Sequence, residues 1–147
     1  FANKSIEEIF TKEELENTLE LKVNTLQTRY FQNNGKGVFT SSQLPKEVNY
    51  STVFSVNSIK NNKAKSDAIL LSGNYCSVNT WQTPYDASYG VTLTLSENNE
   101  FENVEDSGFY IDGEVRSVKQ ITINKKNYIV AAVNNGPLRF FEIINKN

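Results

Sequence analysis

The densest group of chemically versatile side chains lies in the stretch GNYCSVNTWQTPYDASYG, residues 73–90. It contains three tyrosines, the single tryptophan and the single cysteine of the chain, with Asp86 among the aromatic residues. An aspartate in an aromatic pocket could act as a general acid or base. After Pro84 and Tyr85, however, a carboxylate more simply accepts amide hydrogen bonds and fixes a turn. We therefore predict a structural role for Asp86.

Two further carboxylates, Asp112 and Glu114, could form the acid pair of a glycan-active enzyme. Positions i and i+2 of a strand point to the same side, but the Asp112-Gly113 step predicts a turn, so the sequence does not fix their separation. Glu114 is better explained as an ion-pair partner of Arg116 on one strand face. A carboxylate-based enzyme using two of Asp86, Asp112 and Glu114 stays as an alternative.

Aromatic residues in a polar loop are suited to stacking on sugar rings or anchoring a protein partner. Trp81 and Tyr85 lie in the polar segment NTWQTPYD and are the candidate ligand-binding residues. Tyr75 and Tyr89 stand at strand edges and are predicted to be core residues. Cys76 has no neighbouring cation to lower its pKa, so we expect a small buried hydrophobic residue.

Composition excludes several functions. The chain has no histidine, so Ser-His-Asp triads, Cys-His pairs and imidazole zinc sites cannot form within it. A net charge of -2 gives no footprint for nucleic acid. The apolar run YIVAAV, residues 128–133, is far shorter than the roughly 20 residues that span a bilayer. We expect no cofactor, no nucleic acid partner and no membrane span.

Secondary-structure signals place these residues in a β-rich domain. Two S/T-x-x-E capping boxes in residues 5–20 predict two short helices, within a helical lead-in over residues 1–22. From residue 23 to 147 the apolar period changes to two, between turns rich in Asn and Gly. Nine strand candidates follow, at residues 26–32, 38–42, 50–56, 67–73, 89–95, 101–104, 115–123, 128–133 and 138–144.

This spacing predicts an all-β, antiparallel fold with a short N-terminal helical segment. Phe39 and Phe101 follow similar strand-turn patterns 62 residues apart, which favours repeated propeller-type blades. Residues 24–41 would be the last two strands of one blade, 50–104 a whole blade, and 115–144 the first three strands of another.

Five motifs along the chain strengthen this interpretation: YFQNNGKGVF, DAILLSGN, YDASYG, IDGEVR and VAAVNNGPLRFF. In this order they resemble the C-terminal part of FG-GAP or VCBS-repeat β-propeller proteins of the ASPIC/UnbV type, common in Bacteroidetes. The resemblance implies a piece of a larger, exported bacterial protein without established enzymatic activity. A chain that starts at Phe1 and contains no Met fits such a processed piece. The motif residues, structural by this resemblance, are Asp86, Gly90, Asp112, Gly113, Glu114 and Arg116.

One loop departs from the family pattern. Blades of this family often carry a calcium loop before the strand that matches DAILLSGN. Here the segment NSIKNNKAKSD keeps Asp67 and, as further oxygen donors, Asn57 or Asn61, while three lysines oppose a divalent cation. We therefore expect no metal at this degenerate loop.

Taken together, the sequence predicts a non-catalytic scaffold or recognition module for a glycan or protein ligand. Its other partner would be the rest of the parent propeller, in an extracellular, periplasmic or outer-membrane-associated location. A purely structural element that closes a larger propeller is a further alternative.

Overall fold

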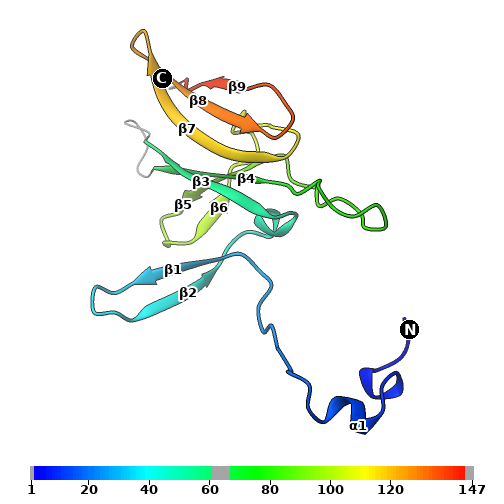
Figure 1. The fold of residues 1–147 in the computed structure, drawn as a ribbon. Coiled ribbons are helices and arrows are strands. Elements are labelled where there is room, and N and C mark those ends of the chain that lie inside the picture. The colour runs from blue at the N-terminus through cyan, green and yellow to red at the C-terminus, as the bar shows by residue number, and fades with distance from the viewer. Residues whose placement is uncertain (1, 61–66, 145–147) are drawn as a thin grey trace.

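The computed structural model describes residues 2–60 and 67–144, which form three open antiparallel sheets (Figure 1). Sheet 1 is a hairpin of β1 (Arg29–Asn33) and β2 (Phe39–Gln43). Sheet 2 contains β3 (Val53–Ile59), β4 (Ala68–Gly73), β5 (Val91–Leu95) and β6 (Phe101–Asn103) in that order. Sheet 3 contains β7 (Val115–Ile123), β8 (Lys126–Val133) and β9 (Arg139–Glu142). The expected all-β class with nine strands is confirmed for the described residues.

The helical elements are short and lie where the capping signals predict them. The 3-10 turn η1 spans Ile6–Glu8, and α1 spans Lys12–Leu15. In the second capping box the Thr11 amide donates to the Glu14 carboxylate at 2.8 Å, while the Glu14 amide donates to Thr11 Oγ1 at 3.3 Å. A second 3-10 turn, η2 (Lys46–Asn49), joins sheets 1 and 2. No helix in the described part of the chain has the length and apolar character to cross a bilayer.

An offset of 62 residues relates β1 and β2 to β5 and β6, and β3 to β7. Asn33 pairs with Phe39 in sheet 1, and Leu95 pairs with Phe101 in sheet 2, each residue 62 positions after its counterpart. The first strands of sheets 2 and 3 match as well, because each has a β-bulge, between Val53 and Ser55 and between Val115 and Ser117. A bulge at the same position in both strands shows that the sequence repeat is also a structural one.

Among the described residues the core consists of two clusters, one on each face of sheet 2. Sheet 3 covers one face, and η2 with sheet 1 lies toward the other (Figure 1). Across the first interface the Val118 amide donates to Ser55 Oγ at 2.9 Å, which ties β7 to β3 in the buried layer. Each buried aliphatic side chain contributes roughly 1.5–3 kcal/mol to this packing. The cluster toward sheet 3 comprises Ile59, Leu70, Phe109, Ile111, Val115, Val118, Ile129 and Ala131. The other cluster comprises Val48, Leu71, Val91 and Leu93.

Candidate functional site

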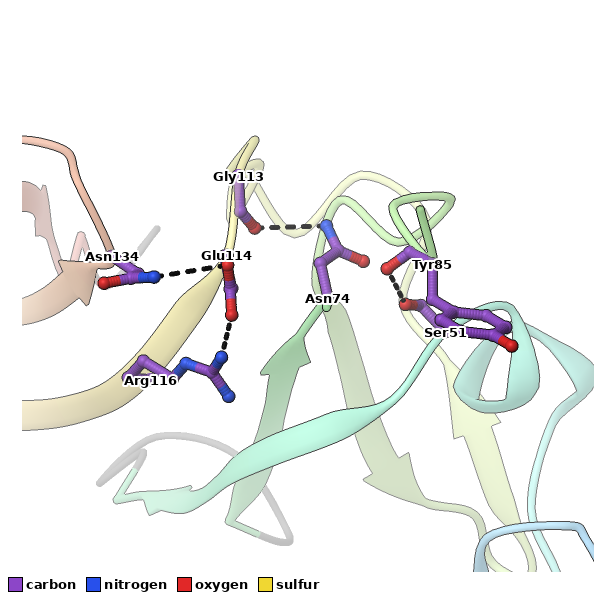
Figure 2. A network of polar contacts seen from close by, with 7 residues as sticks. All are labelled: Ser51, Asn74, Tyr85, Gly113, Glu114, Arg116 and Asn134. Carbon is purple, nitrogen blue, oxygen red and sulfur yellow. Dashed lines mark hydrogen bonds and ion pairs between the residues drawn. The ribbon is translucent and has the colours of Figure 1, made fainter. Parts of the chain in front are cut away.

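The loop that joins β4 to β5, residues 74–90, begins at a buried asparagine that fixes both of its ends. Asn74 is 1% exposed and has a φ of 74°, a left-handed conformation that asparagine tolerates better than most residues. Its Nδ2 donates to the carbonyl of Ser88 at 2.7 Å and to that of Gly113 at 3.1 Å. Its Oδ1 accepts the Ser88 amide at 3.2 Å. One side chain thus joins the start of the loop, its end and the segment before β7. Figure 2 shows the contact with Gly113.

The two strands of the loop are also joined at its base. Tyr75 and Tyr85 form an antiparallel bridge, with N–H to O distances of 2.8 and 2.9 Å. The hydroxyl of Ser51 donates to the Tyr85 carbonyl at 2.6 Å, as Figure 2 shows. Residues 76–84 therefore project from a closed base, as the green segment beyond β4 in Figure 1 shows. Asp86 is an exposed residue of this loop, and its structural role stays a prediction.

Trp81 and Tyr85 are exposed, as the sequence predicts. Trp81 is 77% exposed next to a turn in which the Gln82 amide donates to the Asn79 carbonyl at 2.9 Å. Tyr85 is 54% exposed, and its backbone rather than its ring fixes it to the base of the loop. The two rings are presented separately: Trp81 belongs to the projecting part of the loop, residues 76–84, and Tyr85 lies at its base.

The prediction that Tyr75, Tyr89 and Cys76 are buried is wrong, since all three are exposed. They lie beyond the end of β4 or before the start of β5, where the chain has left the layer that an adjacent sheet covers. Tyr89 instead stacks on Tyr110, with ring centroids 4.6 Å apart and an interplanar angle of 11°. The Tyr75 ring lies 6.4 Å from that of Phe54.

Glu114 and Arg116 form the predicted ion pair next to this loop. Glu114 is 5% exposed, and its second carboxylate oxygen accepts the Asn134 side-chain amide at 3.3 Å (Figure 2). The Arg116 guanidinium lies 4.1 Å from the centre of the Phe54 ring and 5.8 Å from that of Tyr75. Arg116 is therefore held between a buried carboxylate and an aromatic surface, and both of these stabilise its positively charged guanidinium group.

Sequence reasoning missed Phe54, although a signal for it exists. Phe54 and Arg116 are the extra residues of the two equivalent bulges, 62 positions apart. A bulge turns its extra side chain away from the regular alternation of the strand. Aligning the two repeats would have placed Phe54 next to Arg116 at the same end of adjacent sheets.

The two motif glycines are required by close packing and by backbone geometry. Gly90 has a φ of 86°, and a Cβ there would lie 2.8 Å from the Phe109 ring. Gly113 has a φ of 98°, and a Cβ there would lie 2.9 Å from Val133 Cγ1. Backbone geometry and close packing therefore both favour glycine at these two positions.

The three candidate carboxylates have different surroundings. Glu114 is engaged by Arg116 and Asn134, whereas Asp86 and Asp112 are exposed. Across residues 2–60 and 67–144 no three His, Cys, Asp or Glu side chains gather closely enough to hold a metal ion. Most of the degenerate calcium loop, residues 61–66, lies outside the described residues.

Comparison with known proteins gives no family for the chain: no family model, curated protein or solved structure matches it. The resemblance to FG-GAP and VCBS-repeat proteins therefore stays a prediction from the motifs.

Proposed function

We propose that the chain is a segment of a β-propeller and acts as a non-catalytic recognition module. In this proposal, loop 74–90 presents Trp81 and Tyr85 to a glycan ligand. The supporting observation is the contrast within the loop, whose base is fixed by the buried Asn74 while Trp81 is 77% exposed. A ring held on a preorganised loop loses little conformational entropy when it binds.

The residues around Trp81 favour a sugar over an apolar ligand. A flat aromatic face can stack on the apolar side of a sugar ring, while nearby amides and carboxylates bond its hydroxyl groups. Asn79, Gln82 and Asp86 are exposed in the same loop and provide such groups. A protein ligand anchored by the same rings is the other form of the recognition hypothesis.

The remaining parts of the proposal rest on the sequence motifs and the repeat. The 62-residue repeat supports blades of a propeller, and the motif resemblance supports an exported parent protein. The carboxylate-based enzyme has less support, because Glu114 is engaged in an ion pair and a hydrogen bond. A purely structural propeller element is the second candidate, favoured by the outer edge of β9, with which no other strand among the described residues pairs.

The test is binding of the purified chain to a broad glycan array, with Trp81→Ala and Trp81→Phe variants. We expect reproducible binding that falls at least about tenfold in Trp81→Ala, since hot-spot aromatic residues contribute more than 1.4 kcal/mol. Trp81→Phe should retain part of it because a ring remains.

Phe31→Ala provides the matched control, because Phe31 is an exposed aromatic residue on β1, in a different sheet. Its binding should equal that of the parent chain. Glycan binding that persists in Trp81→Ala would place the ligand elsewhere. Absence of binding in every variant would leave the structural propeller element as the better explanation.

A further inference from the structure

Sheets 2 and 3 share their register up to the third strand. In sheet 2, Ile69 of β4 pairs with Leu93 of β5. In sheet 3, Ile129 of β8 pairs with Phe141 of β9. Because β4 and β8 are also equivalent relative to their bulged first strands, β9 occupies in sheet 3 the place of β5 in sheet 2.

The two strands differ at their outer edges. In sheet 2 the edge of β5 carries β6, and the Thr92 carbonyl accepts the Val104 amide at 2.8 Å. The equivalent of Thr92 in sheet 3 is Phe140, and no strand in the described part of the chain pairs with that edge. The Ile143 amide donates inward to the Asn127 carbonyl at 2.9 Å. Backbone groups alternate along an antiparallel strand, so those of Phe140 and Glu142 point outward.

A cavity of about 550 Å³ lies beside this edge, between sheets 2 and 3. Its lining includes apolar side chains from both sheets and from the connection between them: Ile59, Leu70, Phe109, Ile129, Phe141 and Ile143. Thr92 of β5 also lines the cavity, and Tyr30 of β1 is its equivalent 62 positions earlier in the chain. A cavity of this size can hold a large side chain.

The equivalent place between sheets 1 and 2 shows what such a cavity receives. Phe101 of β6 pairs with Leu95, and its ring packs edge-on against Tyr30, with centroids 4.9 Å apart. The register equivalents of Leu95 and Tyr30 are Ile143 and Thr92, which both line the cavity. A residue paired with Ile143 on a fourth strand would therefore point into it.

We propose that the outer edge of β9 and the adjacent cavity bind an extended peptide segment that carries a phenylalanine. The segment would add a fourth strand to sheet 3, with its phenylalanine opposite Ile143, as β6 does in sheet 2. The last strands of sheets 1 and 2 both start with phenylalanine followed by polar residues, FTSSQ in β2 and FEN in β6. Main-chain hydrogen bonds would supply affinity, and the phenylalanine pocket would supply specificity. This inference deepens the propeller-segment part of the proposed function and does not depend on loop 74–90.

The test uses fluorescein-labelled ENNEFENVE, residues 97–105 of this chain, and its Phe101→Ala counterpart, in fluorescence anisotropy titrations of the whole protein. The parent peptide should bind saturably. The alanine peptide should bind at least about tenfold more weakly, because the large side chain that fills the cavity is lost.

Protein variants test the edge itself. Glu142→Pro removes an outward amide donor, a change that an edge strand tolerates. It should weaken peptide binding at least about tenfold, since main-chain pairing is lost. Glu142→Ala keeps the amide but also loses the 2.8 Å ion pair with Lys126, so it measures the contribution of the side chain, and the effect of Glu142→Pro is compared with it. Circular dichroism of both variants checks that the sheets persist.

Three results would overturn the proposal: no binding of the parent peptide, equal binding of the alanine peptide, or equal binding by Glu142→Pro. Self-association of the protein that Glu142→Pro abolishes, without peptide binding, would assign the edge to a second copy of the chain instead. Trp81→Ala should leave peptide affinity unchanged, so a failure of the recognition loop and a failure of this site can be distinguished.

Discussion

The hairpins β3–β4 and β7–β8 have the same backbone design but different surroundings. Each starts with a bulged strand and ends in an asparagine, Asn74 or Asn134. The Asn74 amide donates to the Thr52 carbonyl at 3.0 Å, and the Asn134 amide donates to the Glu114 carbonyl at 2.8 Å. Thr52 and Glu114 are again 62 positions apart, so even the hydrogen bond that ends the hairpin is repeated.

The asparagine side chains differ because a sheet follows the first hairpin and none in the described residues follows the second. Asn74 is buried and bonds Gly113, at the start of the next sheet. Asn134 is exposed and donates to Glu114 within its own sheet. A repeated backbone therefore does not repeat its polar chemistry, since the neighbouring layer determines it. The fixed loop base at residues 74–90 is a property of this particular interface.

The largest expected difference between the hairpins concerns Gly73 and its register equivalent Val133. A Cβ at Gly73 would lie 1.7 Å from the Thr52 carbonyl oxygen, which is backbone and cannot move aside cheaply. Gly73→Ala should therefore lower the free energy of unfolding by more than about 3 kcal/mol. Val133→Ala, which removes two methyl groups from a half-buried side chain, should cost only about 1 kcal/mol. Urea denaturation compares the two, and equal effects would contradict the structural difference.

Removing the asparagine side chains should give the next largest difference. Asn74→Ala loses three hydrogen bonds and places alanine at a positive φ, which together should cost about 2–4 kcal/mol. Asn134→Ala loses one part-buried hydrogen bond made by an exposed side chain and should cost about 1 kcal/mol. Asn74→Gly separates the two contributions, because glycine accepts the backbone conformation. Urea denaturation provides the free energies, and an Asn134→Ala effect as large as that of Asn74→Ala would count against the comparison.

The bulge residues should show a smaller effect. Arg116→Ala leaves the buried Glu114 without its cation and should cost about 2 kcal/mol, moderated by the partial exposure of the arginine. Arg116→Lys keeps the charge but loses the flat stacking on Phe54, so its stability should lie between those of the parent and the alanine variant. Thermal unfolding of the three proteins measures this order. A lysine variant as unstable as the alanine variant would show that charge contributes nothing.

The smallest effect concerns the segment between sheets 2 and 3 and appears at alkaline pH. The pKa of Tyr110 is raised above its ordinary value of 10.0, first by loss of solvent and then by its hydrogen bond and charge interaction with Tyr89. The folded state therefore favours the neutral hydroxyl of Tyr110. The contribution of this preference to the free energy of unfolding is fully present below the pKa of the unfolded chain and is lost as the pH rises through the folded-state pKa. Tyr110→Phe should therefore lose stability less steeply than the parent above about pH 10. Urea denaturation from pH 8 to 11 measures the two slopes, and parallel slopes would contradict the shift.

Much of the fold can be predicted from the sequence because its local signals agree with one another. Alternating apolar residues and turns rich in Asn and Gly locate the nine strands, and the capping boxes locate the short helices. The Phe39 and Phe101 patterns give the 62-residue repeat that the registers follow. These features depend on neighbours along the chain, which a sequence displays directly.

The surroundings of the candidate site could be predicted only in part. The exposure of Trp81 and the pairing of Glu114 with Arg116 follow from local polarity and spacing. The burial of Asn74 and the contact of Phe54 with Arg116 depend on which sheet packs next, a property of distant residues. The exposure of Tyr75 and Tyr89 cannot be predicted for the same reason, because a strand pattern does not show where an adjacent layer ends.

Amide hydrogen exchange, followed by NMR in the free protein, tests most directly whether loop 74–90 is a preformed platform. The amides of Tyr75, Tyr85 and Ser88 make the hydrogen bonds that fix the base of the loop. We predict that they exchange as slowly as the amides of β4 and that Asn74→Ala makes them exchange faster than those of β8. Exchange of these amides at the rate of an open loop in the parent protein would contradict the central claim, because the aromatic rings would then have no fixed base.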